Sequence, residues 1–290
     1  MRRAITIQQE RGQIHTVESL TEVFESIASI KIAKLRGRVV ASKDFFAELW
    51  STYSSLRVDP KEQLTRSGKT TNGRNVFIAV TTEGKLSGEI GSLVIAELLE
   101  ALKLPSKKDV DIIILGSQGA ERLKQLGAEP THTFKLPEGD EQASVTEIIE
   151  MVEQYDQISV FYQTYESIRV QRVARIELVS AVRELSNEAT EGQDDEVEIV
   201  SSREYIFEPS ISEIADYLES LMMGVALSQV LLESKLAQYA SRFNAMNNAK
   251  HRAREIGGDY DRLYHRAKRA EGDERLKETM KVILAQGPLK

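Results

Sequence analysis

Apolar side chains recur at steps of three and four along the first part of the chain. They are Ile14, Val17, Leu20, Phe24, Ile27 and Ile30. Residues at this spacing lie on one face of a helix. The segment from about residue 10 to residue 57 holds two glycines and no proline, so the pattern predicts one continuous helix. At about 1.5 Å per residue this helix is roughly 70 Å long, which is too long for an ordinary compact domain.

The last third of the chain carries a second helical pattern, which begins at a capping signal. Ser210 and Glu213 fit a capping box, in which a serine hydroxyl and a glutamate three residues later satisfy free amides. Steps of three and four then join Ile211, Ile214, Leu218, Leu221 and Val225, and one row continues through Leu232, Tyr239 and Met246. The other row continues through Ser228, Lys235 and Arg242. The spacing predicts a coiled-coil seam that weakens where this second row turns polar.

The predicted C-terminal helix meets no proline between Ile211 and Pro288. At about 1.5 Å per residue it would exceed about 100 Å. Gly257 and Gly258 interrupt the pattern, and two interior glycines cost about 2 kcal/mol relative to alanine. We therefore expect a kink or a local break at this pair.

Strand-type and helix-type runs alternate in the middle of the chain, after Pro60 and the polar stretch 67–73. Strands are expected at 75–80, 111–115, 158–162 and 169–179, and helices at 89–102, 119–126 and 145–155. Such alternation predicts a small, partly parallel, layered domain. From Glu184 to Glu198 the chain has seven acidic residues and no basic one, which predicts a solvated loop or a flexible hairpin.

The elements predict three segments: a shaft helix at 1–58, a central α/β domain at 73–200 and a second shaft helix at 205–286. Two long helices from opposite ends of a chain are most simply arranged as an antiparallel pair. The predicted fold class is therefore α/β, with a long antiparallel coiled coil of the N- and C-terminal helices and a central Rossmann-like α/β domain.

Composition narrows the class of protein. Hydrophobic residues make up 41% of the chain and charged residues 29%, with a net charge of −7, which fits long solvated helices and disfavours general nucleic-acid binding. The absence of cysteine excludes disulfides and thiolate metal sites and favours a cytosolic compartment. No run approaches the roughly 18 apolar residues of a membrane span, and the first residues lack a signal peptide. We expect a soluble chain whose membrane link runs through partners.

Two glycine motifs resemble phosphate-binding loops and fall short of them. Gly68-Lys69-Thr70 resembles the end of a P-loop, but the glycine required five residues earlier is replaced by Gln63. Gly116-Ser117-Gln118-Gly119 follows a strand and opens a helix, a common phosphate position, without the G-x-G-x-x-G spacing. We interpret the first as a polar linker and the second as a plain strand-to-helix turn.

The remaining chemistry-bearing residues form no reaction centre. The four histidines are scattered and make no H-E-x-x-H pair, and no nucleophile elbow is present. We assign no catalytic, cofactor-binding or metal-binding residue. From Arg242 to Lys277 there are ten basic and six acidic residues. This stretch is either a solvated helix with ion pairs four residues apart or a surface that faces an acidic partner.

Several motifs resemble the gamma subunit of F-type rotary ATP synthases. In the last third these are Tyr205–Ser210 (Y-I-F-E-P-S), Leu231–Lys235 (L-L-E-S-K), Tyr239–Ala249 (Y-A-S-R-F-N-A-M-N-N-A) and Tyr264–Lys268 (Y-H-R-A-K). Ala28–Arg36 resembles the front-helix motif M-V-A-A-x-K-L-R. Two family motifs are replaced, one by Thr82–Ile90 and the other, I-T-Q-E, by Gly272–Arg275. The chain therefore resembles a divergent gamma, of the kind found in the alternate N-type branch.

The resemblance implies a non-catalytic rotor. The expected function is that of the central stalk, coupling ion flow through a membrane ring to ATP synthesis or hydrolysis in a ring of α and β subunits. Expected partners are the α and β subunits, an epsilon subunit and the c-subunit ring, and the expected place is the cytoplasmic face of the cell inner membrane. Residues expected to face the α/β ring are Lys235, Arg242, Met246, Arg262, Arg266, Arg269, Glu274 and Arg275.

Two other interpretations remain open from the residues alone. One is a coiled-coil scaffold protein with a non-catalytic α/β domain. The other is an α/β enzyme that uses the middle domain.

Overall fold

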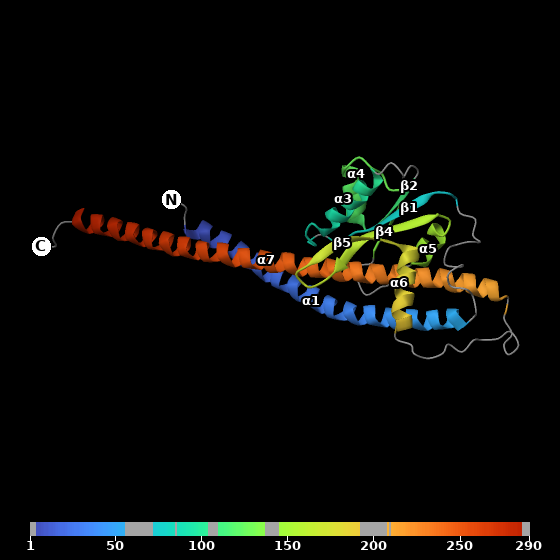
Figure 1. Cartoon of the computed structure of the whole chain (residues 1–290). Coiled ribbons are helices and arrows are strands. Elements are labelled where there is room, and N and C mark those ends of the chain that lie inside the picture. Colours follow the sequence, from blue (N-terminus) through green and yellow to red (C-terminus); the bar gives the residue numbers. More distant parts are fainter. Residues whose placement is uncertain are drawn as a thin grey trace. The chain divides into compact units, whose positions relative to one another are not determined.

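The computed structural model describes residues 4–55, 72–84, 86–103, 110–136, 145–191, 208 and 210–285. The chain divides into two compact units, one formed by residues 1–27 with 243–290 and the other by residues 28–242. Helix α1 (Ala4–Ser55) and helix α7 (Ile211–Ala285) contribute residues to both units (Figure 1). Gly68-Lys69-Thr70 and most of the Tyr205–Ser210 motif lie outside the described residues.

The second unit contains a five-stranded sheet in the order β3-β2-β1-β4-β5 (Figure 1). The strands are β1 (Asn75–Val80), β2 (Val110–Leu115), β3 (His132–Phe134), β4 (Gln157–Tyr165) and β5 (Gln171–Glu177). β1 pairs in parallel with β2 and β4, β2 pairs in parallel with β3, and β5 pairs antiparallel with β4. The predicted partly parallel sheet is confirmed. The sequence pattern does not predict β3, because three residues are too few to show a period.

Helices cover both faces of this sheet. They are α3 (Ile90–Leu102), α4 (Ser117–Gln125), α5 (Thr146–Val152) and α6 (Leu178–Glu191). Phe77 and Ala79 of β1 belong to a core shared with α3 and α4, whereas Ile78 and Val80 belong to a core shared with α5, α6 and α7. Successive side chains of a strand point to opposite faces. A strand that is covered on both faces is therefore apolar at nearly every position, as β1 is.

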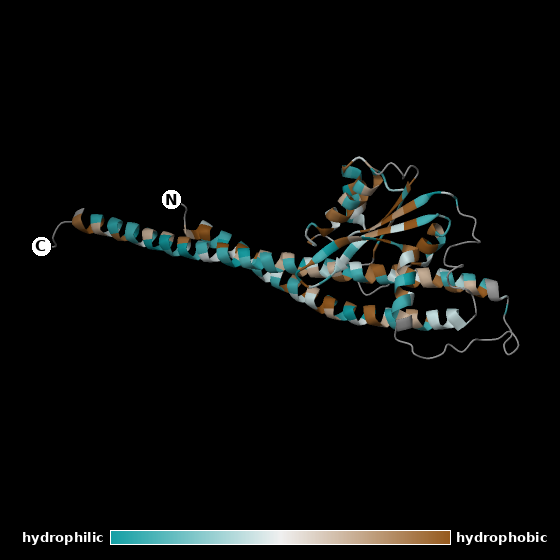
Figure 2. Cartoon of the chain, in the orientation of Figure 1, coloured by the Kyte–Doolittle hydropathy of each residue, from teal (hydrophilic) through white to brown (hydrophobic). Residues whose placement is uncertain are grey.

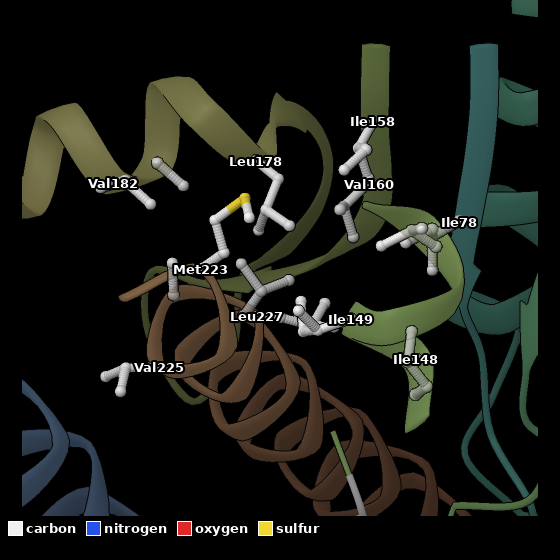
Figure 3. Close-up of a cluster of buried hydrophobic side chains, with 14 of the residues drawn as sticks. Ile78, Ile148, Ile149, Ile158, Val160, Leu178, Val182, Met223, Val225 and Leu227 are labelled. Carbon is white, nitrogen blue, oxygen red and sulfur yellow. The ribbon is translucent and has the colours of Figure 1, made fainter. Parts of the chain in front are cut away.

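Helix α7 contributes to the second of these cores. Figure 3 shows Met223 and Leu227 pointing toward Ile149 and Leu178, while Val225 lies on another side of the helix. The heptad pattern therefore accounts for only one side of α7, because a further side is buried against the sheet and its helices. By length and composition, a window within Glu213–Leu284 of mean hydropathy 1.2 is apolar enough to cross a membrane, but 56% of it is buried inside the protein. Such burial is typical of a core helix.

Helix α6 corrects the prediction of a solvated loop from Glu184 to Glu198. The helix covers the first half of that stretch, and its buried side chains Leu178, Ala181 and Val182 join the core. Glu184 and Glu188 are exposed, so the acidic residues mark the solvent face of an amphipathic helix. A count of acidic residues does not predict this helix, because the count ignores how the acidic and apolar residues are spaced. Residues 192–198 lie outside the described part of the chain.

The two local signals predicted along α7 have opposite outcomes. The serine half of the predicted capping box is confirmed, since the backbone N–H of Glu213 donates to Ser210 Oγ at 3.2 Å. The predicted break at Gly257-Gly258 is wrong, because α7 continues through both residues as a helix. A β carbon on Gly257 would lie 3.6 Å from Ile14 Cγ2 of α1. Contact with α1 within the first unit offsets the low helix propensity of glycine.

In the first unit, the two ends of the chain lie side by side and run in opposite directions. The backbone N–H of Ala4 donates to Glu271 Oε1 at 2.8 Å, and Arg254 Nε donates to Glu18 Oε1 at 2.6 Å. Two more ion pairs join Arg11 to Asp261 and Lys250 to Glu25. Residue numbers rise on α1 as they fall on α7, so the predicted antiparallel pairing is confirmed within this unit.

The contact face of α1 includes only part of the apolar face that the sequence pattern singles out, because Ile14 lies against Gly257 while later residues of that face are exposed. Val17, Leu20, Phe24 and Ile27 are 50%, 52%, 38% and 44% exposed, whereas Thr21 is 7% exposed. The contact also buries Ala4 and Ile7 against Ala267 of α7. Charged residues pair across the two helices, and hydrophilic residues dominate this part of α7 (Figure 2). Steps of three and four therefore identify a helix face without showing whether the partner helix covers it.

Candidate partner interface

A buried polar network fills the crevice at the carboxyl ends of β1 and β4. Gln163 Nε2 donates to Val80 O at 3.1 Å, and Gln238 Nε2 donates to Thr81 O at 3.1 Å. Ser234 Oγ, one turn before Gln238 on α7, donates to Gln163 Oε1. In open α/β sheets, ligands bind at this point, where the strand order reverses. Here side chains of α7 occupy it, so the network fastens the helix to the sheet.

The turn from Gly116 to Gly119 uses its own backbone amides internally. The N–H of Gly119 donates to Thr81 Oγ1 at 3.1 Å, and the N–H of Gln118 donates to Thr82 O at 3.1 Å. These are the amides that a phosphate-binding helix N-terminus would present to its ligand. Since they are already bonded, the geometry favours the plain strand-to-helix turn.

The α/β domain holds Arg242 in place. Arg242 Nη2 donates to Ser87 Oγ at 3.0 Å, and the guanidinium lies 5.3 Å from the ring centre of Tyr239. Ser241 Oγ donates to Ser87 O at 2.7 Å. Arg242 Nε is buried and has no hydrogen-bond partner among the described residues. Arg242 therefore ties α7 to the loop after β1, in addition to any role toward a partner.

Lys235 lies in a basic neighbourhood on α7. Burial lowers the pKa of its ammonium, and the positive charges of Arg38 and Lys31 on α1 lower it further. Like charges held together in this way create a positive potential that attracts acidic groups. Lys235 thus has the electrostatic character expected of a residue that faces an acidic partner.

The expected interface residues of the first unit differ in exposure. Arg262, Arg266, Arg269, Glu274 and Arg275 are exposed, whereas Met246 is 6% exposed. Arg262, Arg266 and Arg269 stand at steps of four and three, so they share one face of α7. Their contacts are local: Arg262 Nη1 lies 3.5 Å from Asp259 Oδ1, and Arg269 Nε donates to His265 O at 3.3 Å. This face is available to a partner. Met246 is buried, so it offers a partner little surface.

Other basic residues of the same stretch are paired across the helices. Lys250 bonds Glu25, and Arg254 bonds Glu18, both on α1. The hydrogen bond from Arg254 lowers the pKa of Glu18. The basic stretch therefore has two roles within the first unit, since some of its cations join α7 to α1 and others project into solvent.

An exposed apolar stripe on α1 is a surface feature that the sequence interpretation missed. Its residues in the first unit are Val17, Leu20, Val23, Phe24 and Ile27. The signal was the same spacing that predicts the helix. The spacing alone does not show whether such a face is covered by the partner helix or left exposed.

The described residues offer no group of three or more His, Asp or Glu side chains placed to hold a metal ion.

Comparison with known proteins gives a family match over almost the whole chain. The family described as ATP synthase matches residues 4–278. The ATP synthase gamma chain of Mycoplasmoides gallisepticum is 23% identical over 284 residues, covering 94% of this chain and 96% of that protein. The ATP synthase gamma chain of Frankia casuarinae is 25% identical over 276 residues, covering 90% and 91%.

Solved structures share the fold. A chain in the OSCP/F1/c-ring structure of the Euglena gracilis mitochondrial ATP synthase matches with a TM-score of 0.61 at 15% identity, covering 98% of this chain and 97% of that one. A chain in the central stalk and c-ring structure of the Tetrahymena thermophila mitochondrial ATP synthase matches with a TM-score of 0.56 at 19% identity, covering 79% and 99%.

Proposed function

This chain belongs to the ATP synthase family as a gamma subunit, and we propose that the surfaces of α1 and α7 described above are those that meet the surrounding subunits. Its function is that of the central stalk, the rotating part of the complex. The observation that carries the role is the antiparallel pairing of the chain's two ends. Contacts between the two helices extend from the Ala4–Glu271 hydrogen bond to the Glu25–Lys250 ion pair. A pair joined along its length resists twisting, as the transmission of torque requires.

The partners in this proposal are the α and β subunits around the paired helices, with an epsilon subunit and a c-subunit ring toward the membrane. Structures of similar fold come from a rotor with F1 and a c-ring, which supports this set of partners. The chain is then part of a membrane-associated complex, and we place it at the cytoplasmic face of the cell inner membrane, attached through partners.

The mechanism follows from the asymmetry of the shaft. An off-centre pair of helices presents different side chains to each β subunit, so it stabilises a different conformation in each. A ligand or partner shifts a conformational equilibrium only by its differential affinity for the states. Rotation of the shaft moves those differences from site to site, and reciprocal coupling lets nucleotide binding drive rotation.

In this proposal, the α/β domain holds helix α7 in place. Gln238 and Ser234 of α7 occupy the crevice that would otherwise bind a ligand. An α/β enzyme using this crevice would need α7 to leave it. The geometry therefore favours a non-catalytic subunit.

Among the expected interface residues, the exposed arginine face is best placed to meet the ring. Arg262, Arg266 and Arg269 project from one face of α7, with Glu274 and Arg275 also exposed farther along. Long charged side chains attract acidic groups at a distance without the close apolar fit that would obstruct turning. Lys235 and Arg242 extend this role in the second unit, while Met246 contributes mainly to packing.

The test is reconstitution with the α and β subunits of the same organism. We expect the chain to co-purify with both, and a variant with Arg266→Glu and Arg269→Glu to lower ATP turnover several-fold without changing the melting temperature of the free chain. A matched control carries Arg122→Glu and Lys124→Glu on exposed positions of α4, with the same change in charge.

Failure to co-purify would support the coiled-coil scaffold instead. Equal turnover in the two variants would remove the arginine face from the interface while leaving the family assignment intact.

A further inference from the structure

A cleft of about 530 Å³ opens in the second unit between α1, α6, α7 and the strands β4 and β5. Val39, Leu185 and Val230 are among the apolar residues that line it. A mostly apolar lining and a volume of about 300–1,000 Å³ are typical of sites for small molecules. The lining of the cleft shares no residue with the polar network at the ends of β1 and β4 or with the interface residues proposed above.

The two cations that line the cleft already have partners. Arg36 Nη2 donates to Tyr165 Oη at 2.7 Å, and its guanidinium lies 5.4 Å from the centre of that ring. Lys43 Nζ donates to Glu188 Oε2 at 2.7 Å. An anionic ligand would have to break one of these contacts, so the cleft is poorly suited to anions.

Two carboxylates of the cleft lack such a partner. Glu184 and Glu233 both line it, and neither forms an ion pair within 4.0 Å among the described residues. Burial raises the pKa of Glu233, although a backbone hydrogen bond with Tyr165 and the positive charge of Lys43 oppose the shift. A buried carboxylate that forms no close ion pair is destabilised in its charged form. A positively charged group that enters the cleft relieves that cost.

The hydroxyl of Tyr162 supplies a third acceptor. Tyr162 is 7% exposed and lines the cleft, and its hydroxyl has no hydrogen-bond partner among the described residues. Burial, followed by the charges of Glu233 and Glu184, raises its pKa to about 12. An unpartnered phenol beside two carboxylates forms a set of oxygens that matches the N–H donors of an ammonium or guanidinium.

We propose that this cleft binds a small organic cation with an apolar body, such as an alkylammonium. The charged head contacts Glu184, Glu233 and the hydroxyl of Tyr162. The alkyl part lies on the apolar lining. The same three groups discriminate against a neutral molecule, which cannot compensate the charge of the carboxylates, and they repel an anion.

The test uses hexylammonium, hexanol and hexanoate as probes on the full chain, followed by NMR of labelled valine and leucine methyl groups. We expect hexylammonium to shift the methyl signals of Val39, Leu185 and Val230 in a saturable manner. Hexanol should bind roughly fivefold more weakly and hexanoate more weakly still, since a partly exposed charge pair contributes up to about 1 kcal/mol.

Glu233→Gln should weaken hexylammonium binding by a similar factor, and the exposed Glu184→Gln provides a second variant that does not disturb the core. Glu48→Gln, on an exposed position of α1 that does not line the cleft, serves as the control and should bind as the parent chain does. Equal binding of hexylammonium and hexanol, or the absence of saturable shifts at these three methyl positions, overturns the proposal.

Discussion

Gly119 lies directly against Thr81. The N–H of Gly119 donates to Thr81 Oγ1 at 3.1 Å, and a β carbon built on Gly119 would come within 2.4 Å of the Thr81 side chain. Thr81 Oγ1 also donates to Leu115 O at 2.9 Å. The threonine thus joins β1, the end of β2 and the start of α4, and only glycine allows α4 to approach it this closely.

Gly119→Ala should destabilise the chain, because the added methyl group has no space and Thr81 cannot rotate without losing its hydrogen bonds. Overpacking of this kind costs about 1–3 kcal/mol. Gly91→Ala on α3 is a matched control, since its β carbon would lie 3.5 Å from Thr82 Oγ1, an ordinary contact. Urea unfolding of both variants measures the difference. A Gly119→Ala chain as stable as the control would contradict the close approach.

Tyr162 should make the stability of the chain fall at alkaline pH. Its pKa is raised from 10.0 to about 12 in the folded chain. Between those values the unfolded chain loses the phenolic proton and the folded chain keeps it, so the unfolded state binds fewer protons. The free energy of unfolding therefore decreases as pH rises through this window.

Tyr162→Phe removes the contribution of this phenol, while Tyr53 and Tyr155, whose pKa values are also raised by burial, still contribute. Denaturant unfolding at a series of pH values above 9 should give a shallower decline for the variant than for the parent chain. Tyr217→Phe is the control, because Tyr217 is 68% exposed. Parallel declines in the parent chain and in Tyr162→Phe would show that the phenol titrates as it does in the unfolded chain.

Glu25 and Lys250 should be energetically coupled across the helix pair. Their side chains are only 18% and 14% exposed, so removing one partner leaves a poorly solvated charge. A double-mutant cycle with Glu25→Gln and Lys250→Met should give a coupling of about 1–2 kcal/mol. The more exposed pair of Glu18 and Arg254 should give a smaller coupling that salt abolishes. Equal couplings in high salt would contradict the difference in burial.

The sequence pattern was sufficient for the elements whose cause is local. Three features depend only on residues that are close in the sequence: the apolar run of β1, the hydrogen bond at the Ser210 cap and the three- and four-residue spacing along the long helices. Their prediction therefore succeeds. The fastening of α7 to the sheet was not predictable in this way. Gln163, Ser234 and Gln238 are ordinary polar residues in the sequence, and they become a network only after β4 and α7 meet.

The contact face of α1 could not be predicted for a related reason. Hydrophobic periodicity assumes that a partner helix covers the most apolar face. Here Thr21 and the charged residues Glu18 and Glu25 lie at the contact, because α7 offers cations to pair with them. Choosing this face requires knowing both helices and their register. For the candidate interface, the sequence suggested residues of α7, and the buried state of Met246 and the internal contacts of Arg242 emerged only from packing.

The exposed stripe on α1 should contribute to assembly and not to the stability of the free chain. Leu20→Gln and Phe24→Gln replace side chains that are 52% and 38% exposed, so each should change the free energy of unfolding by less than about 0.5 kcal/mol. If these side chains formed the helix seam, each replacement would cost about 2–5 kcal/mol. Chemical unfolding of the free chain separates the two cases, with Ile7→Gln as a positive control because Ile7 is 5% exposed.

In reconstitution with α and β subunits, the double variant should show weaker assembly at low protein concentration. Normal assembly together with normal stability would leave the stripe without a role, whereas lost stability would place it in the seam.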